Sequence, residues 1–254
     1  MTDLVLDDVV AVVTGASRGI GEAVAVALAE RGANVLLVAR GEEGLARVAA
    51  RIEEAGGACS TVPLDVTDRD GARDAIEEWT AAAGPVGVLV NNAGTNVRKK
   101  AEDYALDEWD ALIDVNLTAA FHWSRLVFPG MRAQGFGRIV NVASVSGLVA
   151  LPTGAPYAAA KAGLIALTRN LAREWGPAGV TVNALAPWYV RTELTEPVLA
   201  NPPYLERVLA ATPSRRLGTP EDVAAAVLFL CSPGASWING TCLPLDGGFT
   251  SSAL

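Results

Sequence analysis

The fold is decided by one stretch of sequence, VVAVVTGASRGIG at residues 9–21. It begins as an apolar, β-branched run, as expected for a strand with both faces buried. Gly15, Gly19 and Gly21 then let the backbone turn tightly, and a helix that begins there presents its N-terminus to an anion such as a pyrophosphate. The spacing is GxxxGxG instead of GxGxxG, so a simple tight turn is the alternative. Because the loop directly follows the first apolar strand, we favour a dinucleotide site.

Outward from this loop, short apolar runs alternate with longer amphipathic or Ala-rich segments. The predicted strands are Val9–Val13, Asn34–Val38, Ala58–Pro63, Val88–Asn91, Arg138–Ala143, Thr181–Ala186 and Cys242–Leu245. The predicted helices span residues 19–31, 42–55, 68–83, 107–133, 157–175 and 220–231. Strands that alternate with helices imply parallel strands joined by right-handed crossovers. We therefore expect an α/β fold, a single-domain Rossmann fold with a seven-stranded parallel, doubly wound sheet and helices on both faces.

Length and charge exclude several other classes of protein. The 254 residues carry 20 Lys+Arg against 28 Asp+Glu, a net charge of −8, and 51% are hydrophobic. The apolar fraction is too high for a disordered chain, and no linker divides residues 1–254 into separate domains. The acidic balance argues against a nucleic-acid partner, which requires a basic surface to replace counterions. No apolar run approaches the ~18 residues of a membrane helix, so we expect no membrane partner.

The cysteines and the histidine argue against a metal centre. Cys59, Cys231 and Cys242 form no CxxC pair, and His122 is the only histidine. A zinc site or a disulfide framework is therefore not expected, and we interpret the cysteines as buried, reduced thiols of a cytoplasmic protein. The acidic N-terminus lacks the basic region of a secretory signal, which agrees with that location.

The end of the second predicted strand indicates which dinucleotide binds. A site for NAD places an acidic residue there for the ribose hydroxyls, whereas the 2′-phosphate of NADP requires a cation. The chain has LVAR at residues 37–40, and Arg18 lies in the first loop. The alternative is that Arg18 and Arg40 are solvated surface groups. Two cations on the loops that meet the adenosine favour NADP(H).

A serine, a tyrosine and a lysine form the candidate catalytic group. Tyr157 and Lys161 are four positions apart in an Ala-rich helix, so they share one face. An ammonium group beside a phenol favours the phenolate and lowers the pKa of the phenol toward neutrality. Such a phenol can give a proton to a carbonyl oxygen as hydride arrives, or remove one from an alcohol. Ser144 follows the strand Arg138–Ala143 and can hydrogen-bond the same oxygen.

Together these residues resemble the classical short-chain dehydrogenase/reductase family over about residues 8–249. The matching motifs are TGxxxGxG at 14–21, NNAG at 91–94, and the set of Ser144, Tyr157 and Lys161. The resemblance implies that Asn116 is a fourth catalytic residue, which holds a water that links Lys161 to solvent. It also implies a homotetramer, with a dimer as the alternative. The cofactor-binding residues that it implies are Gly15, Ser17, Arg18, Gly19, Ile20, Gly21, Arg40, Asp65, Val66, Asn92, Ala93, Gly94, Tyr157, Lys161, Pro187, Val190 and Thr192.

Residues 188–219 interrupt the alternation of strands and helices with several prolines, as expected of a substrate lid beyond a strand's carboxyl end. The family usually has Pro-Gly after the sixth strand, whereas this chain has Pro187-Trp188. We expect the Trp188 ring beside the nicotinamide or over the substrate pocket. The surrounding segments resemble the tropinone-reductase-like branch of the family. The candidate pocket residues are Val97, Leu148, Trp188, Tyr189 and Leu194.

The sequence therefore predicts an NADP(H)-dependent oxidoreductase that interconverts a ketone or aldehyde and an alcohol, with Tyr157 as general acid/base. Its substrate is expected to be a small-molecule, fairly apolar carbonyl compound. A 3-oxoacyl-carrier-protein reductase shares these motifs, but the loops 133–137 and 175–179 contain no cation for an acidic carrier. A non-catalytic nucleotide-binding protein is the remaining alternative, although such proteins usually lack the tyrosine or the lysine. The basic run at residues 98–100 could meet an anionic substrate, but a solvated loop is the simpler interpretation.

Overall fold

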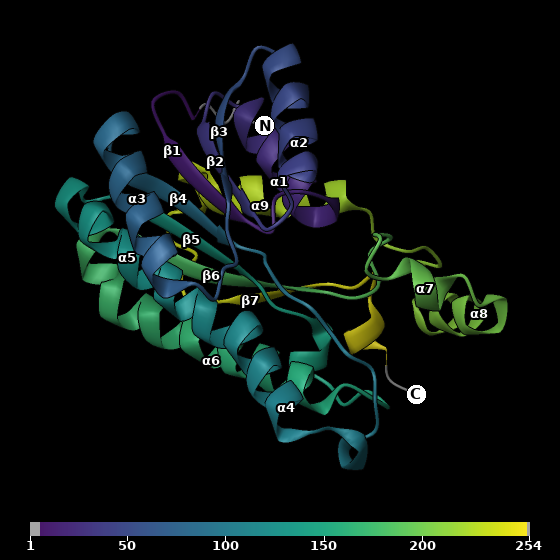
Figure 1. Ribbon diagram of the computed structural model, residues 1–254. Coiled ribbons are helices and arrows are strands. Elements are labelled where there is room, and N and C mark those ends of the chain that lie inside the picture. Colours follow the sequence, from purple (N-terminus) through teal and green to yellow (C-terminus); the bar gives the residue numbers. More distant parts are fainter. Residues whose placement is uncertain (1–5, 253–254) are drawn as a thin grey trace.

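The computed structural model describes residues 6–252 and contains a seven-stranded parallel sheet (Figure 1). The strands are β1 (Val10–Thr14), β2 (Asn34–Ala39), β3 (Ala58–Pro63), β4 (Val86–Asn91), β5 (Gly137–Val142), β6 (Val180–Pro187) and β7 (Cys242–Leu245). Their order across the sheet is β3-β2-β1-β4-β5-β6-β7. Every predicted strand is present, and the ends differ from the prediction by no more than two residues.

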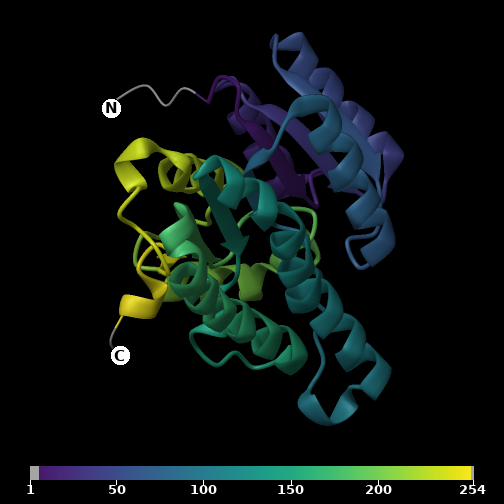
Figure 2. The same cartoon turned by 90° about the vertical axis from the view of Figure 1, so that its left-hand side faces the viewer.

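Helices cover both faces of this sheet (Figures 1 and 2). The helices are α1 (Gly19–Ala29), α2 (Glu42–Glu54), α3 (Arg69–Ala83), α4 (Leu106–Ile113), α5 (Ala119–Gln134), α6 (Ala155–Trp175), α7 (Glu196–Leu199), α8 (Pro202–Ala211) and α9 (Pro220–Cys231). On one face α1, α2 and α9 bury apolar side chains such as Leu28 and Val227. On the other, α3, α5 and α6 bury Ile76, Trp123 and Leu171. The predicted fold class is therefore confirmed.

The strand order changes direction next to β1, which lies between β2 and β4. In the parallel register Val13 pairs with Leu37 on one side and with Val90 on the other. The chain fills one half of the sheet through β2 and β3 and then crosses over to β4. Doubly wound sheets bind ligands outside the carboxyl ends of the strands at such a point. The loops after β1, β4, β5 and β6 therefore meet where a ligand site is expected.

Two regions differ from the regular alternation. The helix predicted at residues 107–133 is not continuous, because a π-helical turn at Asp114–Thr118 separates α4 from α5. The predicted insertion at residues 188–219 carries α7 and α8, which project beyond the ends of the strands in Figure 1. The first difference matters for the site, since the π-helical turn contains Asn116.

The cysteines are free, but only Cys231 is buried; Cys59 and Cys242 are partly exposed, so the expectation of three buried thiols was wrong. Within residues 6–252, no helix combines the length and hydropathy that a membrane span requires. The same residues contain no group of three or more His, Cys, Asp or Glu side chains placed to hold a metal ion.

Candidate active site

The glycine loop after β1 lies against the NNAG segment after β4. Gly15 and Gly19 have φ angles of 67° and 58°, in the left-handed region that favours glycine. A Cβ atom on Gly15 would lie 2.9 Å from Cα of Ala93, and one on Gly21 would lie 2.1 Å from the carbonyl oxygen of Gly15. Any side chain would therefore fill this turn. The glycines leave a backbone cradle without side chains at the start of α1, which fits the pyrophosphate of a dinucleotide.

Hydrogen bonds from the NNAG segment hold this cradle in place. The Asn92 side chain donates to the carbonyl oxygens of Thr14, at 2.9 Å, and Gly15, at 3.2 Å. In return, Oγ1 of Thr14 accepts from the backbone N–H groups of Asn92 and Ala93, both at 3.1 Å. Asn92 and Ala93 thus fix the shape of the glycine loop, whatever further contact they make with a ligand.

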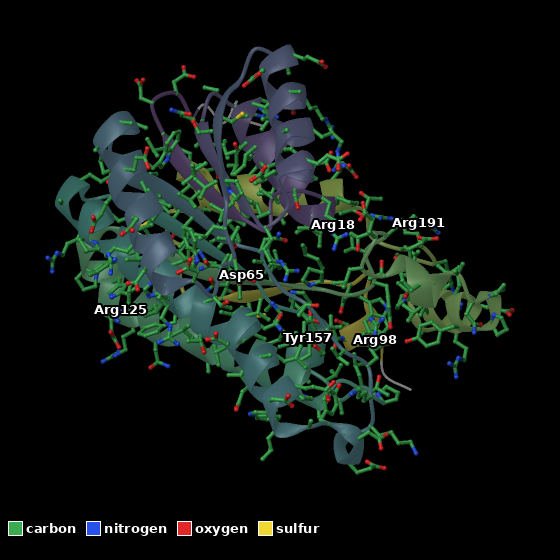
Figure 3. All side chains as sticks on the ribbon, in the orientation of Figure 1. Arg18, Asp65, Arg98, Arg125, Tyr157 and Arg191 are labelled. Carbon is green, nitrogen blue, oxygen red and sulfur yellow. The ribbon has the colours of Figure 1, made fainter. Side chains whose placement is uncertain are left out.

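The two arginines expected to bind a phosphate lie at the surface. Nη1 of Arg40 is 3.7 Å from Oδ2 of Asp65, and the Arg40 side chain is 79% exposed. Nη1 of Arg18 is 2.6 Å from Oε2 of Glu193, a contact that joins the glycine loop to the 188–219 insertion (Figure 3 labels Arg18). A hydrogen bond from the Thr67 backbone, helped by the charge of Arg40, holds the pKa of the Asp65 carboxyl below its usual value. Because both arginines are exposed, they can turn toward a phosphate at little cost.

The other predicted cofactor residues occupy the same edge of the sheet. The Ser17 carbonyl accepts from Arg47 of α2 at 2.8 Å, and Ile20 packs partly buried on the core. Val66 is buried after β3. Pro187 ends β6, and Val190 forms a short parallel bridge with Gly218. A Cβ on Gly19 would lie 3.3 Å from Cγ2 of Thr192, so the insertion begins beside the glycine loop.

Asn116 is held by the π-helical turn with one atom unpartnered. Its Nδ2 donates to the carbonyl oxygens of Thr95 and Leu112, both at 2.9 Å. Its Oδ1 is buried and has no hydrogen-bond partner among the described residues. A Cβ on Gly94 would lie 2.7 Å from this oxygen and 3.4 Å from Nζ of Lys161. The glycine therefore lets the amide oxygen and the ammonium group share one small space, which suits a bridging water.

Lys161 is 3% exposed, unusually buried for a lysine. Its Nζ donates to the carbonyl oxygen of Val142, the last residue of β5, at 2.8 Å. The same atom lies 5.6 Å from the centroid of the Tyr157 ring. Burial lowers the pKa of the Lys161 ammonium to about 8. The lysine thus keeps its charge at neutral pH but can lose its proton in mildly alkaline solution.

Tyr157 lies on α6 within reach of Ser144, which follows β5. Burial raises the pKa of the Tyr157 phenol, and a hydrogen bond with Ser144 and the charge of Arg98 oppose that rise. The sequence led us to expect a pKa lowered by Lys161, and this structure shows the opposite direction. The physical reason is that burial outweighs the nearby charges. A phenol in this state keeps its proton at neutral pH and can donate it.

The aromatic residues of the insertion form their own cluster. The Trp188 ring stacks on Phe249 near the C-terminus, with centroids 3.8 Å apart, and its Nε1 donates to Thr212 at 3.2 Å. The hydroxyls of Tyr189 and Tyr204 are 2.5 Å apart. Trp188 therefore ties the insertion to the C-terminal segment, a contact that its sequence position did not reveal.

One residue near this group was not among the predicted site residues. Arg98 lies after the NNAG segment, close enough to Tyr157 for its charge to act on the pKa of that phenol (Figure 3 labels both residues). The basic run at residues 98–100 was the available signal, but the sequence could not show which of its side chains lies near Tyr157.

Comparison of the sequence with known proteins finds matches among reductases over nearly the whole chain. Residues 15–250 match a family model described as enoyl-(acyl carrier protein) reductase. A tropinone reductase homolog of Arabidopsis thaliana is 42% identical over 94% of this chain and 91% of its own length. The 3-oxoacyl-[acyl-carrier-protein] reductase of Vibrio harveyi is 40% identical over 96% of this chain and 98% of its own.

A solved structure shows the same likeness in three dimensions. Gluconate 5-dehydrogenase of Burkholderia cenocepacia, in complex with NADP and tartrate, superposes with a TM-score of 0.94 at 37% identity. The match covers 99% of this chain and 98% of that one. NADP, the cofactor expected from Arg40, is thus the one that this relative holds. On its sequence, sheet order and glycine cradle, the chain belongs to the short-chain dehydrogenase/reductase family of oxidoreductases.

Proposed function

We propose that the protein is an NADP(H)-dependent oxidoreductase that interconverts a ketone or aldehyde and the corresponding alcohol, with Tyr157 as general acid/base. One observation carries this proposal: the half-buried Tyr157 phenol lies within reach of Ser144, and Nζ of the buried Lys161 is 5.6 Å from the centroid of its ring. The family membership and the NADP held by solved relatives support it.

The cofactor would supply hydride to the carbonyl carbon, and the chain's own residues would manage the oxygen and its proton. Ser144 would hydrogen-bond the carbonyl oxygen, and Tyr157 would donate its phenolic proton to that oxygen, which yields the alcohol. The charge of Lys161 would stabilise the phenolate that remains. A water between Lys161 and Oδ1 of Asn116 would return a proton from solvent. Oxidation of an alcohol would run through the same contacts in reverse.

NADP(H) would lie along the carboxyl edge of the sheet. Its pyrophosphate would contact the backbone of the glycine cradle, and Arg40 would bind the 2′-phosphate. Arg18 would also bind the 2′-phosphate after its ion pair with Glu193 breaks. That ion pair is exposed, so its loss costs about 0–1 kcal/mol. The nicotinamide end would then reach Thr192 and Tyr157. The predicted homotetramer and cytoplasmic location stay predictions from the sequence, as does the lid role of residues 188–219.

A second candidate function is the reduction of 3-oxoacyl groups on a carrier protein. The 40% identity to the Vibrio harveyi reductase favours it. The loops 133–137 and 175–179 contain no lysine or arginine that could bind an acidic carrier, which weighs against it. Turnover of an acyl-carrier substrate far faster than that of free ketones would establish this function instead.

The test is NADPH oxidation, followed by absorbance, with a panel of ketones and aldehydes. Wild-type protein should oxidise NADPH with some members of the panel. Tyr157→Phe should lower kcat by about 100-fold or more, the usual contribution of a positioned general acid. The matched control is Tyr204→Phe, which removes a hydroxyl of the insertion and should leave turnover measurable. Wild-type kcat in the Tyr157→Phe variant would refute the mechanism.

A further inference from the structure

One exposed cation near Tyr157, the guanidinium of Arg98, has no part in the proposed reaction. The guanidinium carbon of Arg98 lies 5.8 Å from the ring centroid of Tyr189. Arg98 comes from the loop between β4 and α4, and Figure 3 labels it near Tyr157. Burial raises the pKa of Tyr157 and of Tyr189, and the charge of Arg98 opposes the rise in both phenols. Arg98 is therefore close to the proton donor and to the base of the insertion.

The backbone on both sides of Arg98 is anchored. The Tyr104 hydroxyl donates to the carbonyl oxygen of Val97. The backbone N–H of Gly154 donates to the carbonyl oxygen of Lys99 at 3.2 Å. Gly154 immediately precedes α6, so this bond joins the loop to the helix that carries Tyr157. The backbone at Arg98 is thus held in place next to the start of α6.

Arg98 differs from its neighbour Lys99 in forming no ion pair within residues 6–252. Nζ of Lys99 lies 2.5 Å and 2.8 Å from the two carboxylate oxygens of Glu108, which neutralise it. Among the described residues, no carboxylate forms an ion pair with Arg98. Its guanidinium faces an aromatic ring, a placement that leaves the in-plane N–H donors available. Arg98 thus presents an unneutralised cation, with donors for an anion, near Tyr157 and Tyr189.

We propose that Arg98 binds a carboxylate on the substrate, so that the protein acts on oxo acids and the matching hydroxy acids. The inference rests on the proposed function, because it places the carbonyl oxygen between Ser144 and Tyr157. The substrate's carboxylate would then point toward Arg98 and Tyr189. A guanidinium fork matches a planar carboxylate through two parallel hydrogen bonds, and one cation suits a monoanion. This differs from the fairly apolar substrate expected from the sequence.

The test compares acids with their uncharged esters. With NADPH, kcat/KM would be measured for acetoacetate and levulinate and for the methyl ester of each, in wild type, Arg98→Gln and Lys100→Gln. Wild type should favour at least one acid over its ester. Arg98→Gln should lower that acid-to-ester ratio about 10- to 100-fold, mainly through KM, as expected for a charged hydrogen bond. Lys100→Gln, the matched control, removes an exposed charge of the same loop and should keep the ratio.

Two outcomes overturn the proposal: no preference for either acid in wild type, or a preference that survives in Arg98→Gln. Calorimetry of levulinate binding to the NADP-loaded protein tests the same contact without turnover. Binding should be detectable in wild type and about tenfold weaker or more in Arg98→Gln. Equal or absent binding in both proteins refutes the role of Arg98, even if turnover of neutral ketones supports the proposed function. Binding without any turnover would instead refute the proposed function alone.

Discussion

Replacing Gly94 by alanine tests whether Asn116 and Lys161 act through the space between them. The added Cβ would lie 2.7 Å from Oδ1 of Asn116, about 0.7 Å inside the 3.4 Å at which ordinary contacts begin. Asn116 cannot yield freely, because hydrogen bonds of 2.9 Å to Thr95 and Leu112 hold its amide in the π-helical turn. The strain must therefore displace the amide, weaken one of these bonds, or exclude the bridging water.

The displacement sets the expected size of the effect. A misplacement of about 1 Å near a reacting group can cost about 100-fold in rate, so a shift of this size should lower kcat by about 10- to 100-fold. Loss of one buried hydrogen bond costs about 1 kcal/mol, which lowers Tm by about 2–4 °C in a chain of this length. The assay is steady-state NADPH oxidation together with thermal unfolding.

The matched control for this change is Gly234→Ala. Its added Cβ would meet only Oγ of Ser232, at 3.7 Å, so neither kcat nor Tm should change. A Gly94→Ala protein with kcat within about twofold of wild type and an unchanged Tm would refute the reasoning, because the strain would then have no consequence.

Three further predictions concern the cofactor, the insertion and pH. Arg40→Ala should raise KM for NADPH about tenfold or more and leave KM for NADH nearly unchanged; equal changes for both would contradict a role at the 2′-phosphate. Trp188→Ala should lower the free energy of unfolding by about 1–3 kcal/mol through loss of its stacked ring, measured by denaturant titration, whereas Trp237→Ala, at a side chain 98% exposed, should not. Since the lowered pKa of Lys161 is about 8, its charge is present below that pH and lost above it, so kcat/KM for reduction should fall as pH rises through about 8. The pKa of Tyr157 is raised, so its phenol stays protonated as pH rises through about 8. A kcat/KM that does not fall near pH 8 would contradict the assignment to Lys161.

The regular part of the fold was predictable because its signals are local. The strands β1, β2, β4, β5 and β6 are buried on both faces, so each is a nearly continuous apolar run that can be recognised without knowledge of its neighbours. The glycine loop was also predictable from the sequence, because a side chain at Gly15 or Gly21 would clash with neighbouring atoms. The proximity of Tyr157 and Lys161 was predictable for the same reason, because residues four positions apart lie on the same face of a helix.

What the sequence did not reveal depends on contacts between distant segments. The π-helical turn at Asp114–Thr118 has the sequence DVNLT, which contains no proline or glycine to distinguish it from a continuous α-helix. The stack of Trp188 on Phe249 joins residues 61 positions apart. Sequence periodicity indicates only contacts within one element, so it could not predict this stack. The direction of the Tyr157 pKa shift depends on burial, which exceeds the effect of neighbouring charges only once the fold is complete.

The central claim is that Tyr157 gives its proton to a carbonyl oxygen as hydride is transferred. The most direct measurement is the single-turnover rate of NADPH oxidation by wild type and Tyr157→Phe, with a ketone that wild type reduces and at saturating NADPH. The account predicts that the variant transfers hydride about 100-fold more slowly or worse, since the oxygen then has no acid to protonate it. A variant that transfers hydride at the wild-type rate would contradict it.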